Sequence, residues 1–256
     1  MRFSKWHALG NDYLLVERAD LARPLDAGTV RGLCDRHTGI GSDGVLEILS
    51  VDGSEADVAI WNPDGSLAEL SGNGTRIVAR WLLDRAGAEE VRVRVGPRVV
   101  VARARPDGTI EQEVGRVDVE APETIELGGE AVELTAVSVG NPHAVVRTDD
   151  PSSAALLELG PAIEGHERFP DRTNVQLVRV DGPHDLTVAV WERGAGETRS
   201  SGTSAVAAAA ASVANGWCES PVSVHLPGGM LLVDVDQEHG ARLIGPAVEI
   251  FRGKLV

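Results

Sequence analysis

The chain has 256 residues and a formal net charge of −15, because 39 acidic side chains outnumber 24 basic ones. This charge disfavours nucleic acid or an anionic membrane as a partner, and a hydrophobic fraction of 43% is typical of a folded chain. No apolar run approaches the ~20 residues of a membrane span, and the first residues do not resemble a signal segment. Cys34 and Cys218 lack a partner motif, so we expect free thiols and a cytoplasmic location.

The first half is expected to contain many strands and one dominant helix. Alternating polar and apolar residues predict the strands, and Ile77, Val78, Trp81 and Leu82 form a helical stripe that Gly87 ends. In chain order we expect a strand, a turn at residues 10–12, a strand at 13–16, a helix at 27–37, strands at 45–49 and 57–61, a helix at 75–86, and strands at 91–95, 98–104 and 110–114.

The second half follows the same plan. Asn215 and Gly216 are expected to end its main helix, which follows Ser201. In chain order we expect strands at 132–139 and 144–147, a helical segment at 153–159, strands at 174–180 and 185–191, the helix after residue 201, and strands at 222–225, 230–235 and 241–244. A last strand at 247–251 would return to the first half, which gives domains of 1–114 with about 246–256, and 115–245.

One stretch occurs twice, 130 positions apart and without a gap. Residues 59–74 and 189–204 each contain a strand, a glycine-containing hairpin, a Ser-Gly pair and the start of a helix; Trp61 corresponds to Trp191 and Ser71 to Ser201. The duplication predicts an α/β (α+β) fold of two pseudo-symmetric halves, each a curved, mostly antiparallel sheet wrapped around a central helix. Two similar halves can present matching groups to opposite faces of one small molecule in a cleft between them.

The two Ser-Gly junctions are the strongest candidate site. Free N–H groups and the helix dipole make a helix N-terminus an anion site, and Gly72, Gly74 and Gly202 would let a carboxylate approach the backbone. The structural alternative is that Ser71 and Ser201 are simply N-caps.

Further polar residues lie near strand ends. Glu192 and Arg193 could bind the ammonium and carboxylate of a zwitterion, or form an ordinary surface pair. Four asparagines could line an uncharged polar pocket or simply favour turns: Asn11, Asn62, Asn141 and Asn174.

Two other patterns carry little weight. Gly39, Gly41 and Gly44 match a dinucleotide fingerprint by spacing, but that fingerprint lies between a strand and a helix, and here a strand follows. We interpret the segment as a turn. Neither Ser71 nor Ser201 lies in a G-x-S-x-G hydrolase elbow.

At these residues the whole chain resembles the diaminopimelate epimerases, which work without a cofactor. K-W-H-A-L-G-N-D-Y at 5–13 resembles the family's K-x-H-G-L-G-N-D-F, and W-N-P-D-G-S-L-A-E-L-S-G-N-G-T-R at 61–76 resembles F-N-A-D-G-S-E-x-x-x-C-G-N-G-x-R. W-E-R-G-A-G-E-T-R-S-S-G-T-S at 191–204 resembles Y-E-R-G-A-G-E-T-x-x-C-G-T-G. The segments at 139–146, 168–175 and 226–229 match the family as well.

The resemblance implies that a substrate lies in the cleft, where one thiolate removes the α-proton and one thiol delivers a proton to the other face. Carried over by position, the backbones of Gly72, Asn73, Gly202 and Thr203 would hold the α-carboxylate. The distal amino-acid end of the substrate would be held by Asn62, Asn174, Glu192 and Arg193. The pocket would be completed by Asn11, Asn141 and His143. No cofactor or metal is expected; a homodimer is the expected assembly.

Both positions of the family's catalytic cysteines are serine here, Ser71 and Ser201. A thiol has a pKa of about 8.5, whereas a hydroxyl is nearer to water at about 15.7 and needs an adjacent base. His143 is the nearest plausible helper. Three hypotheses follow: an amino-acid epimerase with serines as acid and base, an isomerase or lyase of the same fold on another acid, and a non-catalytic binding protein.

Overall fold

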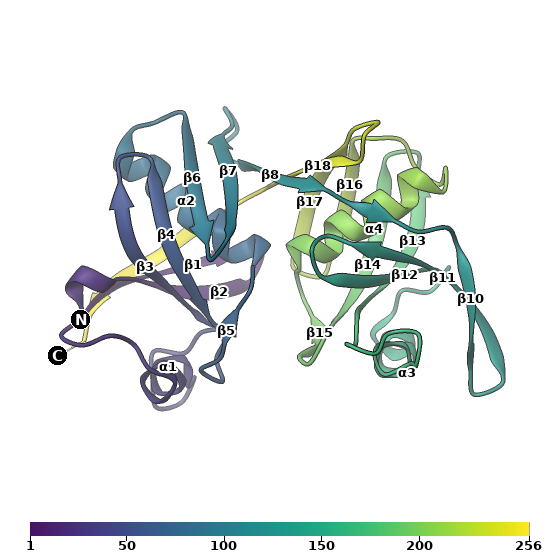
Figure 1. Ribbon diagram of the computed structural model, residues 1–256, viewed down its shortest axis with the longest axis horizontal. Coiled ribbons are helices and arrows are strands. Elements are labelled where there is room, and N and C mark those ends of the chain that lie inside the picture. Colours follow the sequence, from purple (N-terminus) through teal and green to yellow (C-terminus); the bar gives the residue numbers. More distant parts are fainter. Residues whose placement is uncertain (256) are drawn as a thin grey trace. The chain divides into compact units, whose positions relative to one another are not determined.

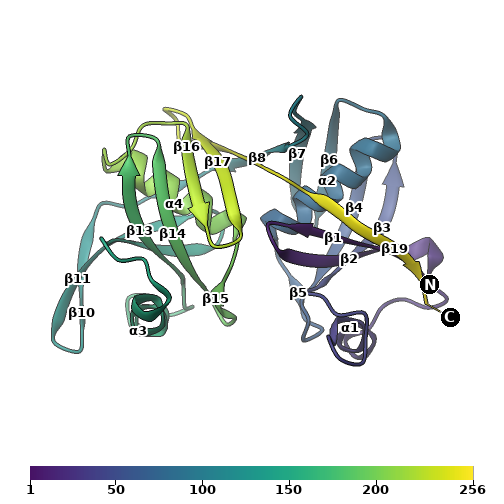
Figure 2. The same cartoon turned by 180° about the vertical axis from the view of Figure 1, so that it is seen from behind.

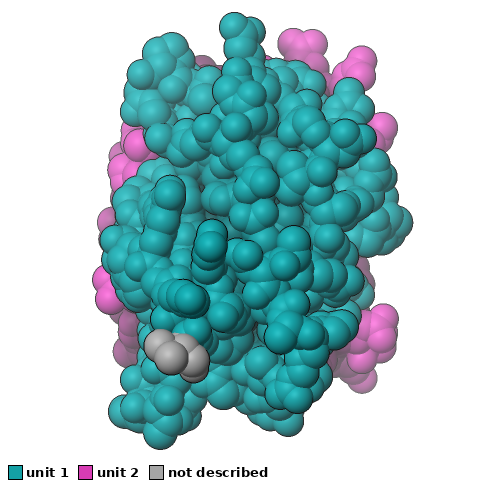
Figure 3. Space-filling model, turned by 90° about the vertical axis from the view of Figure 1, so that its left-hand side faces the viewer, with its two compact units in different colours: residues 1–113, 245–256 teal, residues 114–244 magenta. Residues whose placement is uncertain are grey.

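The computed structural model describes residues 1–255 and divides into two compact units. Unit 1 comprises residues 1–113 and 245–256, and unit 2 comprises residues 114–244; Figure 3 colours them separately. The C-terminal segment therefore returns to the unit in which the chain begins, and Leu255 N donates to Met1 O at 2.9 Å.

Unit 1 has one long helix, α2, surrounded by strands (Figure 1). Its elements are β1 (Arg2–Ala8), β2 (Asn11–Glu17), the 3-10 turn η1 (Arg18–Asp20), α1 (Ala27–Cys34), β3 (Val45–Asp52), β4 (Glu55–Trp61), β5 (Leu67–Ala68), α2 (Gly72–Ala86), β6 (Glu90–Val95), β7 (Arg98–Ala104), β8 (Ile110–Arg116, which continues into unit 2) and β19 (Val248–Lys254).

Unit 2 repeats this arrangement around α4. Its elements are β9 (Asp118–Val119), β10 (Glu123–Leu127), β11 (Glu130–Ser138), β12 (Pro142–Arg147), α3 (Ser153–Glu164), β13 (Asn174–Gly182), β14 (Asp185–Glu192), β15 (Gly196–Thr198), α4 (Gly202–Ala214), β16 (Val222–Leu226), β17 (Gly229–Val235) and β18 (Gly240–Gly245).

Strand pairing shows that the duplication extends through both units. In unit 1 the strands pair in the order β1, β2, β3, β4, β6, β7, and only the β2–β3 and β4–β6 pairs are parallel. In unit 2 the order is β11, β12, β13, β14, β16, β17, and the parallel pairs are β12–β13 and β14–β16, at the same two places. The expectation of an α/β fold with two pseudo-symmetric, mostly antiparallel halves is confirmed.

Each central helix is buried because its sequence carries apolar residues around most of its surface. In α2 the fully buried residues include Ile77, Val78 and Leu82. In α4 the whole run from Ala205 to Ala211 is 0% exposed, and the helix contacts strands on several sides. Alanine side chains are short, so the surrounding sheet can approach the helix closely, and burial supplies most of the stability of such a helix.

The predicted ends of α2 and α4 are confirmed. Gly87 caps α2 in the left-handed conformation at φ 61°, which glycine adopts without strain, and Asn215 caps α4. Strand β19 pairs antiparallel with β1, as expected for the returning strand, and Figure 2 shows the two side by side.

Three local predictions were wrong. The turn after β1 is formed by Leu9 and Gly10, both with positive φ, so that Asn11 already pairs in β2. Helix α1 ends at Cys34, because the Asp35 carboxylate accepts the backbone N–H groups of His37 and Thr38 and so favours a turn. In the β10–β11 hairpin, strand β10 and the Gly128-Gly129 turn were not predicted.

Among residues 1–255, no helix is long and apolar enough to cross a membrane. Within the same residues, no group of three or more histidine, cysteine, aspartate or glutamate side chains is arranged to hold a metal ion.

Candidate active site

Ser71 lies directly before α2 in unit 1 and is its N-cap. Its Oγ accepts the backbone N–H of Gly74 at 3.0 Å and lies 3.1 Å from the hydroxyl of Tyr13 on β2. A Cβ on Gly74 would lie 3.3 Å from Ser71 Oγ, so glycine leaves room for this contact. Ser71 is therefore an N-cap of α2, and its hydroxyl also lies within hydrogen-bond distance of the Tyr13 phenol.

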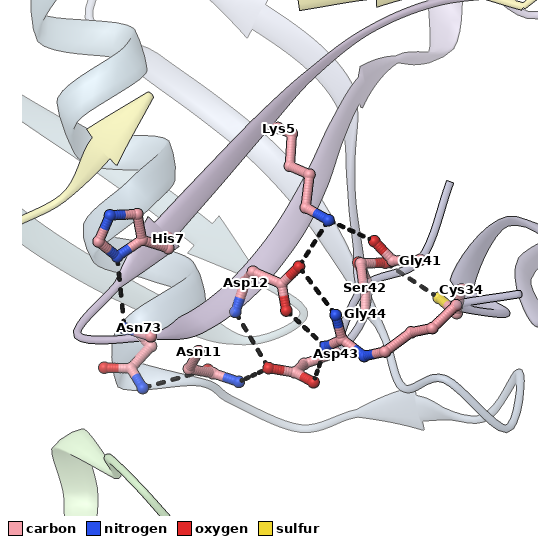
Figure 4. Close-up of polar contacts among 12 residues, drawn as sticks. Lys5, His7, Asn11, Asp12, Cys34, Gly41, Ser42, Asp43, Gly44 and Asn73 are labelled. Carbon is pink, nitrogen blue, oxygen red and sulfur yellow. Dashed lines mark hydrogen bonds and ion pairs between the residues drawn. The ribbon is translucent and has the colours of Figure 1, made fainter. Parts of the chain in front are cut away.

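Asn73 and Asn11 are brought together beside this helix end. Asn73 Nδ2 donates to Asn11 Oδ1 at 3.1 Å, and Asn11 Nδ2 donates to Asp43 at 3.0 Å (Figure 4). Behind them, Arg76 is 0% exposed and donates to Asn73 Oδ1 at 2.8 Å. Burial lowers the pKa of Arg76 to about 10, which still leaves the guanidinium charged near neutral pH. A buried cation and a helix N-terminus together favour an anion at this place.

A charged cluster fixes the loop that carries Asp43. Arg36 bridges Asp12 and Asp43 at 2.6 Å each. Lys5 pairs with Asp12 at 2.8 Å and with the carbonyl of Gly41 at 2.6 Å (Figure 4). Burial opposes ionisation of Asp12, but the hydrogen bonds from Arg36 and Lys5 outweigh it and leave the pKa of Asp12 lowered. The ionised cluster therefore holds Asp43, and through it Asn11, in place.

Asn62 lies apart from this network, in the turn between β4 and β5. Its side chain donates to Ser66 Oγ at 2.9 Å, and its backbone N–H donates to Ser66 O at 2.8 Å. In unit 1 the structure thus brings Asn11, Ser71 and Asn73 together around one helix end and places Asn62 in a separate hairpin.

Ser201 lies directly before α4 in unit 2, at the position that matches Ser71. It is 6% exposed and makes no capping hydrogen bond through its side chain. Gly202 is buried and Thr203 is half-buried in the first turn of the helix. The two serines are therefore equivalent in the backbone and different in their hydroxyl contacts.

His143 on β12 is buried and has a partner on each ring nitrogen. Its Nε2 lies 3.1 Å from Asn141 Oδ1, and its Nδ1 lies 3.1 Å from the Gln176 amide nitrogen. Since that amide nitrogen can only donate, Nδ1 accepts, and Nε2 carries the hydrogen that goes to Asn141. Burial lowers the pKa of His143 to about 3, so the ring is neutral. Both nitrogens are occupied, and the interpretation of His143 as the helper of a serine is not supported.

Asn174 and Arg193 meet through the backbone. Asn174 Oδ1 accepts the N–H of Arg193 at 3.0 Å, and Asn174 Nδ2 donates to Pro142 O at 2.9 Å. The Arg193 side chain is exposed and donates to Asp171 O at 3.3 Å, while Glu192 ends β14 and pairs in register with Gly196. Asn174 therefore fixes the hairpin that carries Glu192 and Arg193.

Three residues with clear roles in these networks were missed from the sequence. Asp43 holds Asn11 and Arg76 holds Asn73 in unit 1. In unit 2, Glu164 holds the hairpin by accepting the N–H of Gly194 at 2.7 Å. Arg76 lies inside the matched motif, three residues after Asn73, which is the one signal that could have identified it. The glycine-rich segment 39–44 is a loop that precedes β3, as interpreted.

The comparisons with known proteins agree with this arrangement. The family model for diaminopimelate epimerase matches residues 3–119 and 135–250. Over the full chain, the protein is 38% identical to a diaminopimelate epimerase of Pseudomonas savastanoi pv. phaseolicola and 39% identical to one of Azotobacter vinelandii, and each match covers 99% of the relative.

Solved structures share the fold at low sequence identity. A hydroxyproline epimerase from Agrobacterium vitis matches with a TM-score of 0.75 at 16% identity, over 99% of this chain and 91% of that one. A probable proline racemase from Agrobacterium radiobacter matches with a TM-score of 0.73 at 15% identity, over 100% and 92% of the two chains. From the family match and the full-length relatives together, the chain belongs to the diaminopimelate epimerase family.

Proposed function

We propose that this protein is a cofactor-independent epimerase that interconverts LL- and meso-2,6-diaminopimelate, in the biosynthesis of lysine and peptidoglycan precursors. The observation that carries the proposal is the pair Ser71 and Ser201. Each directly precedes the central helix of one of two duplicated units, at the two positions where the family places its acid and base. Proton removal on one face of an α-carbon and delivery on the other requires such a pair.

The helix N-termini supply the electrostatics of the reaction. Backbone N–H groups at Gly72, Asn73, Gly202 and Thr203 would bind the α-carboxylate, where negative charge grows as the α-proton leaves. Arg76, buried behind Asn73, adds a positive charge in unit 1. This stabilisation is strongest when the α-carbon is carbanion-like, so it lowers the barrier to proton transfer.

The remaining residues would select the substrate. Asn62, Asn174, Glu192 and Arg193 would bind the distal ammonium and carboxylate, and Asn11, Asn141 and His143 would complete the pocket. His143 is neutral, so it would act as a fixed hydrogen-bonding group and not as a base. No metal or cofactor takes part in this scheme. A homodimer and a cytoplasmic location belong to the proposal as well.

The experiment is solvent deuterium wash-in at the α-carbon, followed by proton NMR, with LL- and meso-diaminopimelate as substrates. L-Lysine, which lacks the distal carboxylate, is the control substrate and should exchange at least tenfold more slowly, because one bidentate ion pair is lost. No exchange above background by folded protein would contradict the proposal.

A second candidate is a binding protein that keeps the pocket without turnover. Two observations favour it. The Ser201 hydroxyl makes no capping hydrogen bond. Both ring nitrogens of His143 are already hydrogen-bonded, so this histidine does not serve as a base for a serine. Titration calorimetry that detects diaminopimelate binding in the absence of deuterium exchange would identify this function.

A further inference from the structure

Tyr13 lies outside the predicted site, and its side chain directly contacts an acid–base position. Its hydroxyl lies 3.1 Å from Ser71 Oγ, and the residue is 8% exposed. The ring is held closely, because a Cβ on Gly44 would lie 2.7 Å from Tyr13 Cε1. The phenol is therefore fixed against Ser71 by packing from the loop before β3.

The hydrogen-bond capacity of Ser71 makes the contact informative. A serine oxygen has two lone pairs and one hydrogen. One lone pair accepts the N–H of Gly74, and a hydrogen from Tyr13 would occupy the other. The hydrogen of Ser71 would then be free to point toward a ligand at the N-terminus of α2.

The chemistry of the two hydroxyls is complementary. An alkoxide is a very unstable product, because its conjugate acid has a pKa near that of water at about 15.7, whereas a phenol has a pKa of about 10. Moving the negative charge from serine to tyrosine therefore makes ionisation easier by a factor of roughly 10⁵ or more.

We propose that Tyr13 acts through Ser71 as a proton-relay partner, so that the acid–base group of unit 1 is a Tyr–Ser hydroxyl pair. This inference rests on the proposed function. When the pair acts as acid, the Ser71 O–H bond breaks as the carbanion's electron pair forms the new Cα–H bond. The hydrogen of Tyr13 moves to Ser71 Oγ, and the negative charge ends on the phenolate. In the reverse direction the phenolate takes the Ser71 hydrogen while Ser71 Oγ takes the α-proton, which leaves the electron pair on carbon.

Unit 2 contains no tyrosine, and the Ser201 side chain makes no capping hydrogen bond. The two acid–base groups are therefore unequal. The isomer whose α-hydrogen meets Ser71 should take up solvent deuterium with retention of configuration faster than it inverts, since one pair can both remove and return a proton.

The test is Tyr13→Phe, measured by the wash-in assay as separate kcat and KM. We expect kcat for exchange to fall about a hundredfold, within the usual range for loss of a proton-transfer group, and KM to change less than about threefold. Ser50→Ala is the control, since it removes another hydroxyl hydrogen bond of unit 1, from Ser50 Oγ to Asp57 at 2.8 Å. Wild-type exchange together with an unchanged kcat in Tyr13→Phe would overturn the relay and leave the proposed function intact. No exchange in the wild type would overturn both.

A thiol background separates chemistry from structure. A cysteine at position 71 ionises without help, so in Ser71→Cys protein the Tyr13→Phe change should lower kcat less than about threefold. An equal loss in both backgrounds would show that Tyr13 only supports the fold and would contradict the relay.

A spectroscopic measurement needs no turnover. Tyr13 is the only tyrosine of the chain, so protein labelled with carbon-13 at tyrosine Cζ gives one resonance. Ser71→Ala should shift this resonance, and the N-cap control Ser152→Ala, on α3 of unit 2, should not. An unshifted resonance in Ser71→Ala would refute the contact on which the proposal stands.

Discussion

Trp191 donates its indole hydrogen to Glu164 over 2.7 Å, and the duplicated Trp61 donates its own to Glu47 over 3.0 Å. Glu47 is 0% exposed and Glu164 is 4% exposed. The two glutamates come from different elements, Glu47 from β3 and Glu164 from α3. The duplication therefore preserves a pair between a half-buried tryptophan and a buried carboxylate, while the element that supplies the carboxylate differs between the units. In unit 2 the same carboxylate also fixes the hairpin after Glu192, which places a structural residue directly behind a predicted binding element.

Replacing Glu164 with glutamine should destabilise unit 2 and loosen this hairpin. The carboxylate accepts hydrogens from Trp191 and from Gly194 and pairs with Arg172 at 2.6 Å, whereas an amide would turn a donor toward other donors. We expect a loss of about 1–3 kcal/mol in the free energy of unfolding, measured in urea. Glu158→Gln on the exposed face of α3 is the matched control and should change stability by less than about 0.5 kcal/mol. Equal effects of the two substitutions would show that Glu164 has no such role.

His143 should remain neutral far below the usual range for histidine. Burial lowers the pKa of His143 to about 3, so the folded state binds no proton there between pH 3 and the unfolded pKa near 6.5. The unfolded state does bind one, so this residue's contribution to stability is complete above about pH 6.5 and falls as the pH is lowered, by up to about 1.4 kcal/mol per pH unit.

The measurement for His143 is nitrogen-15 NMR of its ring across pH 4–8. We expect no titration and a spectrum of the neutral form with hydrogen on Nε2, since Nδ1 accepts from Gln176 and Nε2 donates to Asn141. The His143→Gln variant identifies the resonances. A ring that titrates near pH 6.5 would mean that the site is open to water and would restore His143 as a candidate base.

Local sequence signals predicted those features of the fold that depend on a few neighbouring residues. Gly87 ends α2 because it adopts a left-handed conformation, and Ser71 caps it because a serine hydroxyl accepts an N–H three residues on. The repeat of 130 positions was equally readable, since equivalent strands and helices keep their spacing in both units.

The contacts that give the candidate site its chemistry could not be read in this way. Tyr13 and Ser71 are 58 positions apart, and nothing in either motif indicates that strand β2 carries the phenol to the start of α2. Glu164 lies beyond the helical segment expected at 153–159, and the packing of the longer α3 buries it. Long-range packing decides which hydroxyls and carboxylates become partners, so the sequence predicted the candidate helix ends but not the side chains that contact them.

Restoring both thiols should raise epimerisation if the other pocket residues are in place. A thiol pKa of about 8.5 lies far nearer the working pH than that of a hydroxyl, so we expect the Ser71→Cys, Ser201→Cys double variant to gain at least about a hundredfold in wash-in rate under reducing conditions. The stability effects of the two changes should differ. Ser71→Cys weakens a cap to Gly74 and should cost about 0.5–2 kcal/mol, whereas Ser201→Cys removes no capping hydrogen bond.

Ser152→Cys is the matched control for the thiol restoration, because Ser152 caps α3 through the N–H of Ala155 and lies in neither Ser-Gly junction. It should cost stability as Ser71→Cys does and leave the exchange rate unchanged, which separates capping from proton transfer. A double variant that folds and binds diaminopimelate by calorimetry but gains no exchange would mean that the carboxylate is not held against the two helix ends. In that case the retained asparagines and the Glu192–Arg193 hairpin serve binding alone, and the second candidate function is the correct one.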